Sequence, residues 1–200
     1  MQETRLSPPA LSLLQRSELA RHAMLVLLFG ALTAVSAQIS IPWYPVPLTG
    51  QVFMVLVAGA LLGPRLGLMS QLAYLAIGFL GAPVFAEGKA TAAVMLGPTA
   101  GYLVGFVLAA WLAGWAGRYA RSLPLFALGM AGASLLILAI GGAWLGLGST
   151  LALWPGVPRH DLASGLSYGV TAGVLPFLLA DVVKVAAATA FAWPLIRRAA

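Results

Sequence analysis

The sequence of 200 residues contains no cysteine, only two histidines and only five acidic residues. The absence of cysteine excludes disulfide bonds within the chain, thiolate catalysis, and iron–sulfur or cysteine-ligated zinc sites. The two histidines, His22 and His160, lie on opposite flanks of the hydrophobic part of the sequence, with no second ligand at metal spacing. We therefore expect neither a metal site nor a cofactor.

Charge is also scarce: 8% of the residues are charged, whereas 61% are hydrophobic, and the mean hydropathy is +0.96. Such values lie far outside the range of soluble domains and indicate an integral membrane protein. The net charge of +6 does not indicate nucleic-acid binding, because the basic residues are dispersed and are not interleaved with stacking aromatic residues. No phosphate-binding loop occurs either, so the energy for any transport must come from another chain or from a gradient.

Proline and glycine clusters divide the apolar region into six predicted helices. These cover about residues 20–40, 51–62, 66–80, 98–117, 123–147 and 169–196. Residues 1–19 are expected to be a cytoplasmic lead, with an interfacial helix over about 9–21. Segment 81–101 is rich in glycine and proline yet apolar, so we expect a structured cap or re-entrant segment packed on the bundle. The prediction is a single all-α integral membrane domain, with a bundle of six transmembrane helices over about 20–196.

The basic residues predict the orientation of this bundle. If both termini are cytoplasmic, six crossings place eight of the 11 Lys and Arg residues on the inner side. These eight are Arg5, Arg16, Arg21, Arg65, Arg118, Arg121, Arg197 and Arg198. Lys89 and Arg159 then lie outside, and Lys184 lies within the membrane. This bias follows the positive-inside rule and predicts a multi-pass protein of the cell membrane with both ends in the cytoplasm.

One ionisable pair interrupts the last apolar run. Asp181 and Lys184 lie between Thr171 and Ile196, in a stretch that is otherwise almost wholly apolar. An ionised side chain near the middle of a membrane helix costs roughly 2.5 to 3.5 kcal/mol on insertion scales, so such residues usually serve a function. Residues at i and i+3 share a helix face, and both side chains can point into the bundle. The pair marks a functional site, with a structural ion pair between helices as the alternative.

Small residues at helical spacing lie in the first predicted helix, where Gly30 is followed by Ala34 and Thr33 by Ala37. Such pairs allow two helices to approach closely in lipid. The spacing is compatible both with packing inside the chain and with docking of a partner subunit. Gly101 and Gly105 form a similar pair in the fourth helix, with the same two interpretations.

Four segments together resemble the BioY family, the biotin-specific substrate-binding (S) components of energy-coupling factor (ECF) vitamin transporters. They are VPLTGQ (46–51), LLGPRLGLMSQLAYLAIGFLGAPVFA (61–86), LGPTAGYLVGF (96–106) and the D-x-x-K of residues 181–184. The resemblance covers about residues 39–184, in the family's order and spacing. No single motif is decisive, but GAPVF followed by GPTxGYLxGF and then D-x-x-K is specific as a set.

The resemblance implies a six-helix bundle that binds one vitamin near the external surface. It implies as partners a transmembrane T component and two ABC-type ATPase subunits. In this family the aspartate and lysine of the last helix belong to the vitamin site, which implies this role for Asp181 and Lys184. The polar residue that closes the PLTGQ turn corresponds to Gln51, for which the resemblance implies a role in the same site. The family's Ala-x-x-x-Ala motif on the first helix has no match here, so the expected docking residues are the small ones of that helix. These are Gly30, Thr33, Ala34 and Ala37.

The chemistry of biotin agrees with these residues. Its cyclic urea has two N–H donors and a carbonyl acceptor, its thioether ring is apolar, and its tail ends in a carboxylate. Asp181 could accept from the ureido N–H groups while Lys184 donates to the carbonyl or balances the aspartate. Tyr74, Phe85 and Tyr102 could form the walls of the pocket. Lys89 could meet the carboxylate, or it could be a solvated loop charge.

Other functions remain open at this point. The chain could be an S component for another vitamin, or a solute channel, although a channel calls for a polar stripe along several helices. An intramembrane enzyme could use Asp181 as a base with Lys184 as its electrostatic partner. No second carboxylate or histidine lies in the interior of the predicted spans to complete a hydrolytic site, so we expect no enzymatic activity.

Overall fold

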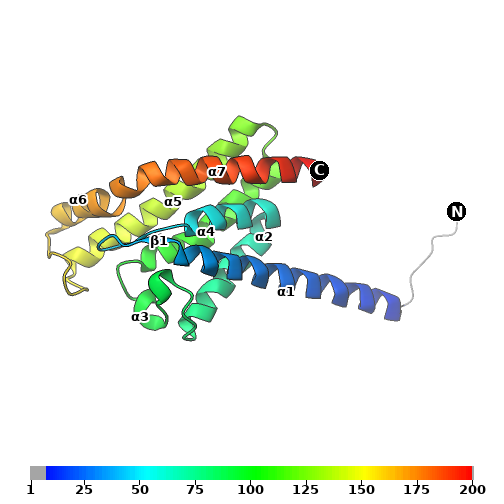
Figure 1. Cartoon of the computed structure of the whole chain (residues 1–200), viewed down its shortest axis with the longest axis horizontal. Coiled ribbons are helices and arrows are strands. Elements are labelled where there is room, and N and C mark those ends of the chain that lie inside the picture. The colour runs from blue at the N-terminus through cyan, green and yellow to red at the C-terminus, as the bar shows by residue number, and fades with distance from the viewer. Residues whose placement is uncertain (1–7, 200) are drawn as a thin grey trace.

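Long apolar runs form a bundle of helices in the computed structural model, which describes residues 8–199 and the side chains of residues 17–198 (Figure 1). Residues 1–7 of the predicted lead lie outside the described part. The helices are α1 (Pro8–Gln38), α2 (Gln51–Phe79), α3 (Ala92–Met95), α4 (Ala100–Tyr119), α5 (Leu123–Thr150), α6 (Leu162–Gly173) and α7 (Leu175–Ala199). Strands β1 (Ser40–Ile41) and β2 (Leu48–Thr49) lie between α1 and α2, and the 3₁₀ helix η1 (Ala86–Gly88) precedes α3.

The described residues form seven α-helices instead of the six predicted. The two helices predicted over 51–62 and 66–80 are parts of α2, and α3 is a single turn within the predicted cap. The last predicted helix starts earlier than expected and is divided at Val174 into α6 and α7. Within residues 8–199, five helices are long and apolar enough to cross a membrane, namely α1, α2, α4, α5 and α7.

Helix α2 folds back on itself at the predicted break. Gly63 has a non-helical backbone (φ 78°, ψ 175°), a conformation that glycine adopts without strain, and Pro64 follows it. The Gln51 Nε2 and Tyr74 hydroxyl atoms, 23 positions apart in sequence, lie 2.7 Å from each other. In a straight helix the same residues would be about 34 Å apart. The two halves of α2 therefore pack side by side as a helical hairpin.

The connection between α1 and α2 is a small antiparallel hairpin, which the all-α prediction missed. Ser40 pairs with Thr49 and Ile41 with Leu48, and the Gly50 N–H donates to the Ile39 carbonyl (2.9 Å). Three prolines in the intervening segment 42–47 lack the N–H group that a helix needs. The chain there instead forms a loop between the two short strands.

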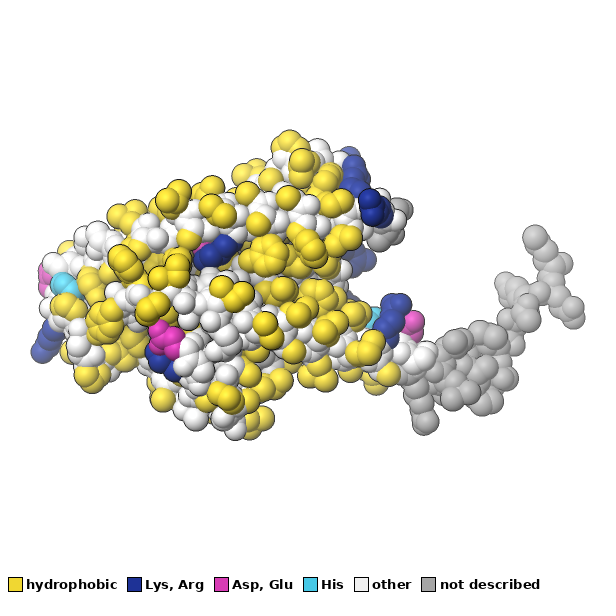
Figure 2. All heavy atoms as spheres, viewed as in Figure 1, with side chains coloured by type: hydrophobic (Ala, Val, Ile, Leu, Met, Phe, Trp, Pro, Cys, Tyr) yellow, Lys and Arg dark blue, Asp and Glu magenta, His cyan; other side chains and the backbone are white. Residues whose placement is uncertain are grey.

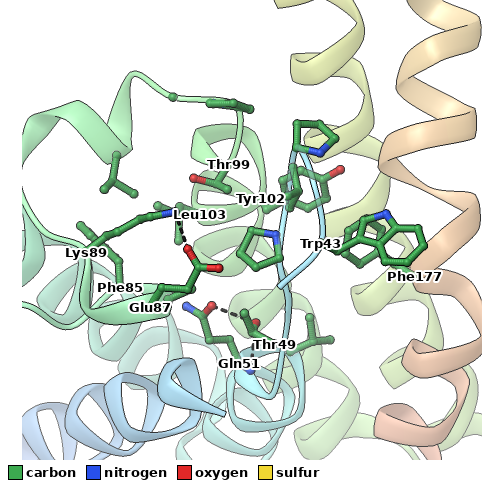
Figure 3. Close-up of a pocket in the computed structure, with 18 of the residues that line it drawn as sticks. Trp43, Thr49, Gln51, Phe85, Glu87, Lys89, Thr99, Tyr102, Leu103 and Phe177 are labelled. Carbon is green, nitrogen blue, oxygen red and sulfur yellow. Dashed lines mark hydrogen bonds and ion pairs between the residues drawn. The ribbon is translucent and has the colours of Figure 1, made fainter. Parts of the chain in front are cut away.

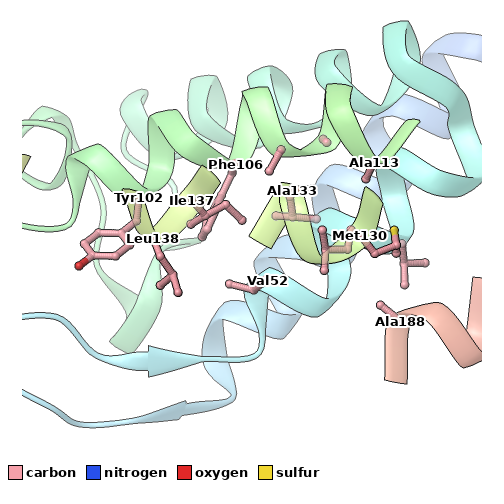
Figure 4. Close-up of a cluster of buried hydrophobic side chains, with 14 of the residues drawn as sticks. Val52, Tyr102, Phe106, Ala113, Met130, Ala133, Ile137, Leu138 and Ala188 are labelled. Atoms are coloured by element: carbon pink, nitrogen blue, oxygen red, sulfur yellow. The ribbon is translucent and has the colours of Figure 1, made fainter. Parts of the chain in front are cut away.

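The interior of the bundle is a cluster of apolar side chains centred on α4 and α5 (Figure 4). Phe106, Met130 and Ile137 are among its buried members. Gly101 and Gly105 belong to this contact, because a Cβ on Gly105 would lie 3.0 Å from the Ile137 Cα atom. The glycine pair of α4 thus packs within the chain. Hydrophobic side chains also cover much of the outer face in Figure 2, as a lipid environment requires.

The segment between α2 and α4 is structured, as predicted, and several elements hold it by hydrogen bonds. The Trp144 Nε1–H of α5 donates to the Gly97 carbonyl (2.9 Å), and the Trp154 Nε1–H donates to the Leu96 carbonyl (2.7 Å). From α2, the Tyr74 hydroxyl donates to the Val84 carbonyl (3.2 Å). This segment, the β hairpin and the start of α6 lie at the left of Figure 1, whereas the first turns of α1 and the end of α7 lie at the right.

Candidate functional site

A cavity of about 760 Å³ lies between the loop 42–47, the cap and helices α2, α4, α5 and α7 (Figure 3). Its size falls within the usual range of pockets for small ligands. Six of the seven predicted ligand-binding residues line it: Gln51, Phe85, Lys89, Tyr102, Asp181 and Lys184. The seventh, Tyr74, does not line the cavity but lies behind the lining residues Gln51 and Phe85. Four distant parts of the sequence thus meet at one site.

The ionisable pair of α7 faces this cavity and is largely buried. Asp181 is 4% exposed, and the Lys184 side chain is 15% exposed. The Lys184 ammonium donates to one Asp181 oxygen (2.9 Å), and the Ser134 hydroxyl of α5 donates to the other (2.9 Å). A lone charge would be costly here, whereas the paired and hydrogen-bonded carboxylate is stabilised. Ser134 was not predicted; its only signal in the sequence is an isolated hydroxyl in an apolar run.

Gln51 is held by a chain of polar contacts at the start of α2. The Thr49 hydroxyl donates to Gln51 Oε1 (2.9 Å), and Gln51 Nε2 donates to the Tyr74 hydroxyl (2.7 Å). Tyr74 in turn donates to the Val84 carbonyl, and its ring meets Phe85 edge-on with centroids 5.5 Å apart. Tyr74 therefore supports Gln51 and Phe85 from behind instead of forming a wall of the cavity.

Aromatic side chains line another side of the cavity. The Tyr102 and Phe177 rings lie 5.9 Å apart, and the Tyr102 hydroxyl donates to the Gly173 carbonyl (2.6 Å) where α6 ends. The Tyr102 ring lies directly over Gly141, where any Cβ atom would overlap it. Trp43, from the loop 42–47, also lines the cavity (Figure 3). Phe177 and Trp43 were missed, because apolar residues in an apolar sequence carry little signal.

The cap contributes two charges to the lining. Lys89 and Glu87 form an ion pair and both line the cavity, with Lys89 the more exposed of the two (Figure 3). Glu87 has a positive φ of 61°, so its backbone makes a tight turn at this point. Lys89 is therefore a cavity residue with a carboxylate partner, and Glu87 is a further lining residue that the sequence did not reveal.

The lining combines apolar aromatic walls, a paired acid and base, a primary amide and a second lysine. Such a site can hold a small, mostly flat ligand that offers both hydrogen-bond donors and acceptors. No group of three or more His, Cys, Asp or Glu side chains within residues 8–199 could hold a metal ion.

The four residues predicted to dock a partner lie at the contact between α1 and α2. Gly30, Thr33 and Ala37 are buried, and Ala34 is half-buried against the core. A Cβ on Gly30 would lie 3.1 Å from the Ser70 carbonyl oxygen of α2. The Gln71 amide donates to the Thr33 hydroxyl across the same contact (3.3 Å). These residues pack within the chain, which favours packing over docking, the two interpretations that the spacing allowed.

Comparison with known proteins identifies the family. The model of the BioY family matches residues 4–200. The chain belongs to the BioY family. It is 42% identical over 176 residues to "Probable biotin transporter BioY" of Pyrococcus horikoshii, covering 86% of this chain and 94% of that protein. It is 36% identical over 166 residues to "Biotin transporter BioY" of Thermotoga maritima, covering 82% and 89%.

A solved structure shares the fold of this BioY protein. It is described as the S-component for biotin from an ECF-type ABC transporter, and it superposes with a TM-score of 0.72 at 22% identity. The match covers 90% of this chain and 93% of that one. The match to the family model and the identity to these relatives confirm the resemblance predicted from four sequence segments. Together with the five long apolar helices, it makes the chain a multi-pass membrane protein.

Proposed function

We propose that this BioY protein binds biotin in the cavity beside Asp181 and Lys184, and that it is the substrate-specificity subunit of an ECF-type transporter. The observation that carries the proposal is the gathering of six predicted ligand residues around one cavity. Relatives named biotin transporters support the ligand, and the solved structure of an S component for biotin supports the assembly. The names of these relatives favour a transporter over the enzyme alternative.

The lining supplies groups that complement each part of biotin. Asp181 already accepts one hydrogen bond on each oxygen, and each oxygen has a further lone pair for a ureido N–H. Lys184 and the Gln51 amide are donors for the ureido carbonyl. Tyr102, Phe177 and other apolar residues would cover the thioether ring, and Lys89 would balance the tail carboxylate.

The direct test is biotin binding by the detergent-solubilised full-length chain. We expect saturable binding of one biotin per chain by titration calorimetry, with no heat from thiamine, which has no cyclic urea. A solute channel has no reason to retain either compound. Equal binding of both vitamins, or of neither, would contradict the proposal.

We also propose six membrane crossings in a single domain of the cell membrane, with both termini in the cytoplasm. The two halves of α2 fold back on each other, which supports counting them as two crossings. Helices α6 and α7 are separated only by Val174, which supports counting them as one. With this count the predicted bias of Lys and Arg toward the inner side is retained.

Cysteine labelling tests this topology in a chain that has no cysteine of its own. Tyr119→Cys lies next to Arg118, and Pro158→Cys lies next to Arg159; both positions are exposed. We expect a membrane-impermeant maleimide to label Pro158→Cys in intact cells and Tyr119→Cys only after permeabilisation. The proposed topology places one crossing, α5, between these two positions. Labelling of both from the same side would contradict it.

The proposed partners are a T component and two ABC-type ATPase subunits, because this chain has no phosphate-binding loop with which to use ATP. If α1 contributes to this assembly, it must do so through its exposed face, which carries Leu28 and Val35. Its small residues are occupied by the contact with α2.

A further inference from the structure

The last residue of α1 binds directly to the cap. Gln38 Nε2 donates to the Phe85 carbonyl (3.1 Å), and Gln38 Oε1 accepts from the Gly88 N–H (3.2 Å). The same Nε2 also donates to the Ala34 carbonyl of its own helix (3.3 Å). One side-chain amide therefore pairs with the backbone on both sides of a tight turn.

The turn that Gln38 holds carries cavity residues. Phe85, Ala86, Glu87 and Lys89 all line the cavity. The turn closes locally through the Phe85 N–H, which donates to the Lys89 carbonyl (3.0 Å), and through the Lys89 N–H, which donates to the Ala86 carbonyl (3.3 Å). Within the part of the chain that the structure describes, both hydrogen bonds that join residues 85–88 to another element come from Gln38.

Packing leaves the charged part of this turn dependent on these bonds. The Phe85 ring is 2% exposed and is fixed between Tyr74 and Gly78. Glu87 and Lys89 have no such apolar anchor, and the Lys89 side chain is 58% exposed. A backbone turn with polar, exposed side chains opens readily unless hydrogen bonds close it. The local hydrogen bonds close the turn on itself, and Gln38 ties it to the end of a long helix.

We propose that Gln38 is a positioning residue, which holds the turn 85–89 closed at the cavity and thereby slows the release of biotin. The inference rests on the proposed function, because it assigns a role in ligand retention to a side chain outside the cavity lining. Gln38 itself does not line the cavity. Its loss should act on dissociation more than on association, since the open turn is already competent to admit the ligand.

Release rates test the proposal with Gln38→Ala and the equal-sized Gln38→Glu, which cannot donate to the Phe85 carbonyl. Bound tritiated biotin is chased with excess unlabelled biotin on the full-length chain in detergent. We expect dissociation about tenfold faster in Gln38→Ala, with the association rate constant unchanged within about twofold. A tenfold change corresponds to about 1.4 kcal/mol, within the net range of one or two hydrogen bonds. Val35→Ala, at a 64% exposed position one turn earlier on α1, is the matched control and should leave both rates unchanged.

Hydrogen exchange of the ligand-free chain gives a second readout that does not need biotin. The peptide covering residues 84–91 should exchange faster in Gln38→Ala, because the Gly88 N–H loses its acceptor, while peptides of α4 and α5 stay unchanged. Unchanged exchange in this peptide would overturn the positioning role. Faster exchange with an unchanged dissociation rate would overturn the role in retention. If Gln38→Ala does not fold, the same two outcomes in Gln38→Leu decide, because leucine can neither donate to the Phe85 carbonyl nor accept from the Gly88 N–H. Failure of the unmodified chain to bind biotin would instead reject the proposed function, and the exchange result would still decide whether Gln38 holds the turn.

Discussion

Asp181→Asn is expected to weaken biotin binding by about 1.5 to 3 kcal/mol, the range for a hydrogen bond to a charged group, or roughly 10- to 150-fold in Kd. The substitution preserves the shape of the side chain but replaces one acceptor oxygen with a donor and removes the negative charge. Ser134 and Lys184 then lose a carboxylate partner, and the ureido N–H groups lose an anionic acceptor. Titration calorimetry on the folded variant measures the loss.

The double variant Asp181→Asn with Lys184→Met separates a ligand site from a structural ion pair. Breaking one side of a buried pair leaves a lone charge, whereas removing both charges is often neutral or stabilising. A structural pair therefore predicts that the double variant recovers both stability and binding. We expect it to recover stability in detergent and to remain deficient in biotin binding. Recovered binding would show that neither charge contacts the ligand.

The central pair of the site could be predicted from the sequence because an ionisable residue in an apolar run is conspicuous. Asp181 and Lys184 are costly in a membrane wherever they point, so their presence alone marked the site. The break at Gly63 was equally readable, since a glycine followed by proline interrupts helical hydrogen bonding. Each of these signals is local and needs no knowledge of the neighbouring helices.

Whether the small residues of α1 dock a partner could not be decided from the sequence, for the opposite reason. Small residues at i and i+4 show that some helix approaches closely, but the sequence does not say whether that helix belongs to the same chain. Gly30 meets the Ser70 backbone of α2, a contact set by the hairpin turn at Gly63 some distance along the sequence. Three other residues were missed for similar reasons. Ser134 and Gln38 have partners 47 to 50 positions away in the sequence, and the position of Glu87 depends on an unusual backbone angle.

Gly59→Leu is expected to give the largest loss of stability, about 3 kcal/mol or more, at the upper end of the range for overpacking. Gly59 lies where the first half of α2 crosses α4. A Cβ there would overlap the Ala110 carbonyl oxygen and would lie 2.9 Å from the Ala113 Cβ atom. Because the nearest atoms belong to helix backbone, no side-chain rotation relieves the overlap. Thermal unfolding in detergent, followed by tryptophan fluorescence, measures the effect.

The site should be lost together with the helix crossing, because the fold of α2 places Gln51 beside Tyr74. Gly132→Leu is the matched control: it makes the same substitution within α5, at a position where a Cβ would have no neighbour within 4 Å. Replacing glycine by leucine in a helix gains backbone propensity, so this variant should be at least as stable as the parent and should bind biotin normally. If Gly59→Leu instead matched Gly132→Leu in both stability and binding, α2 and α4 would not cross at Gly59. The folded-back α2 would then not build this side of the cavity.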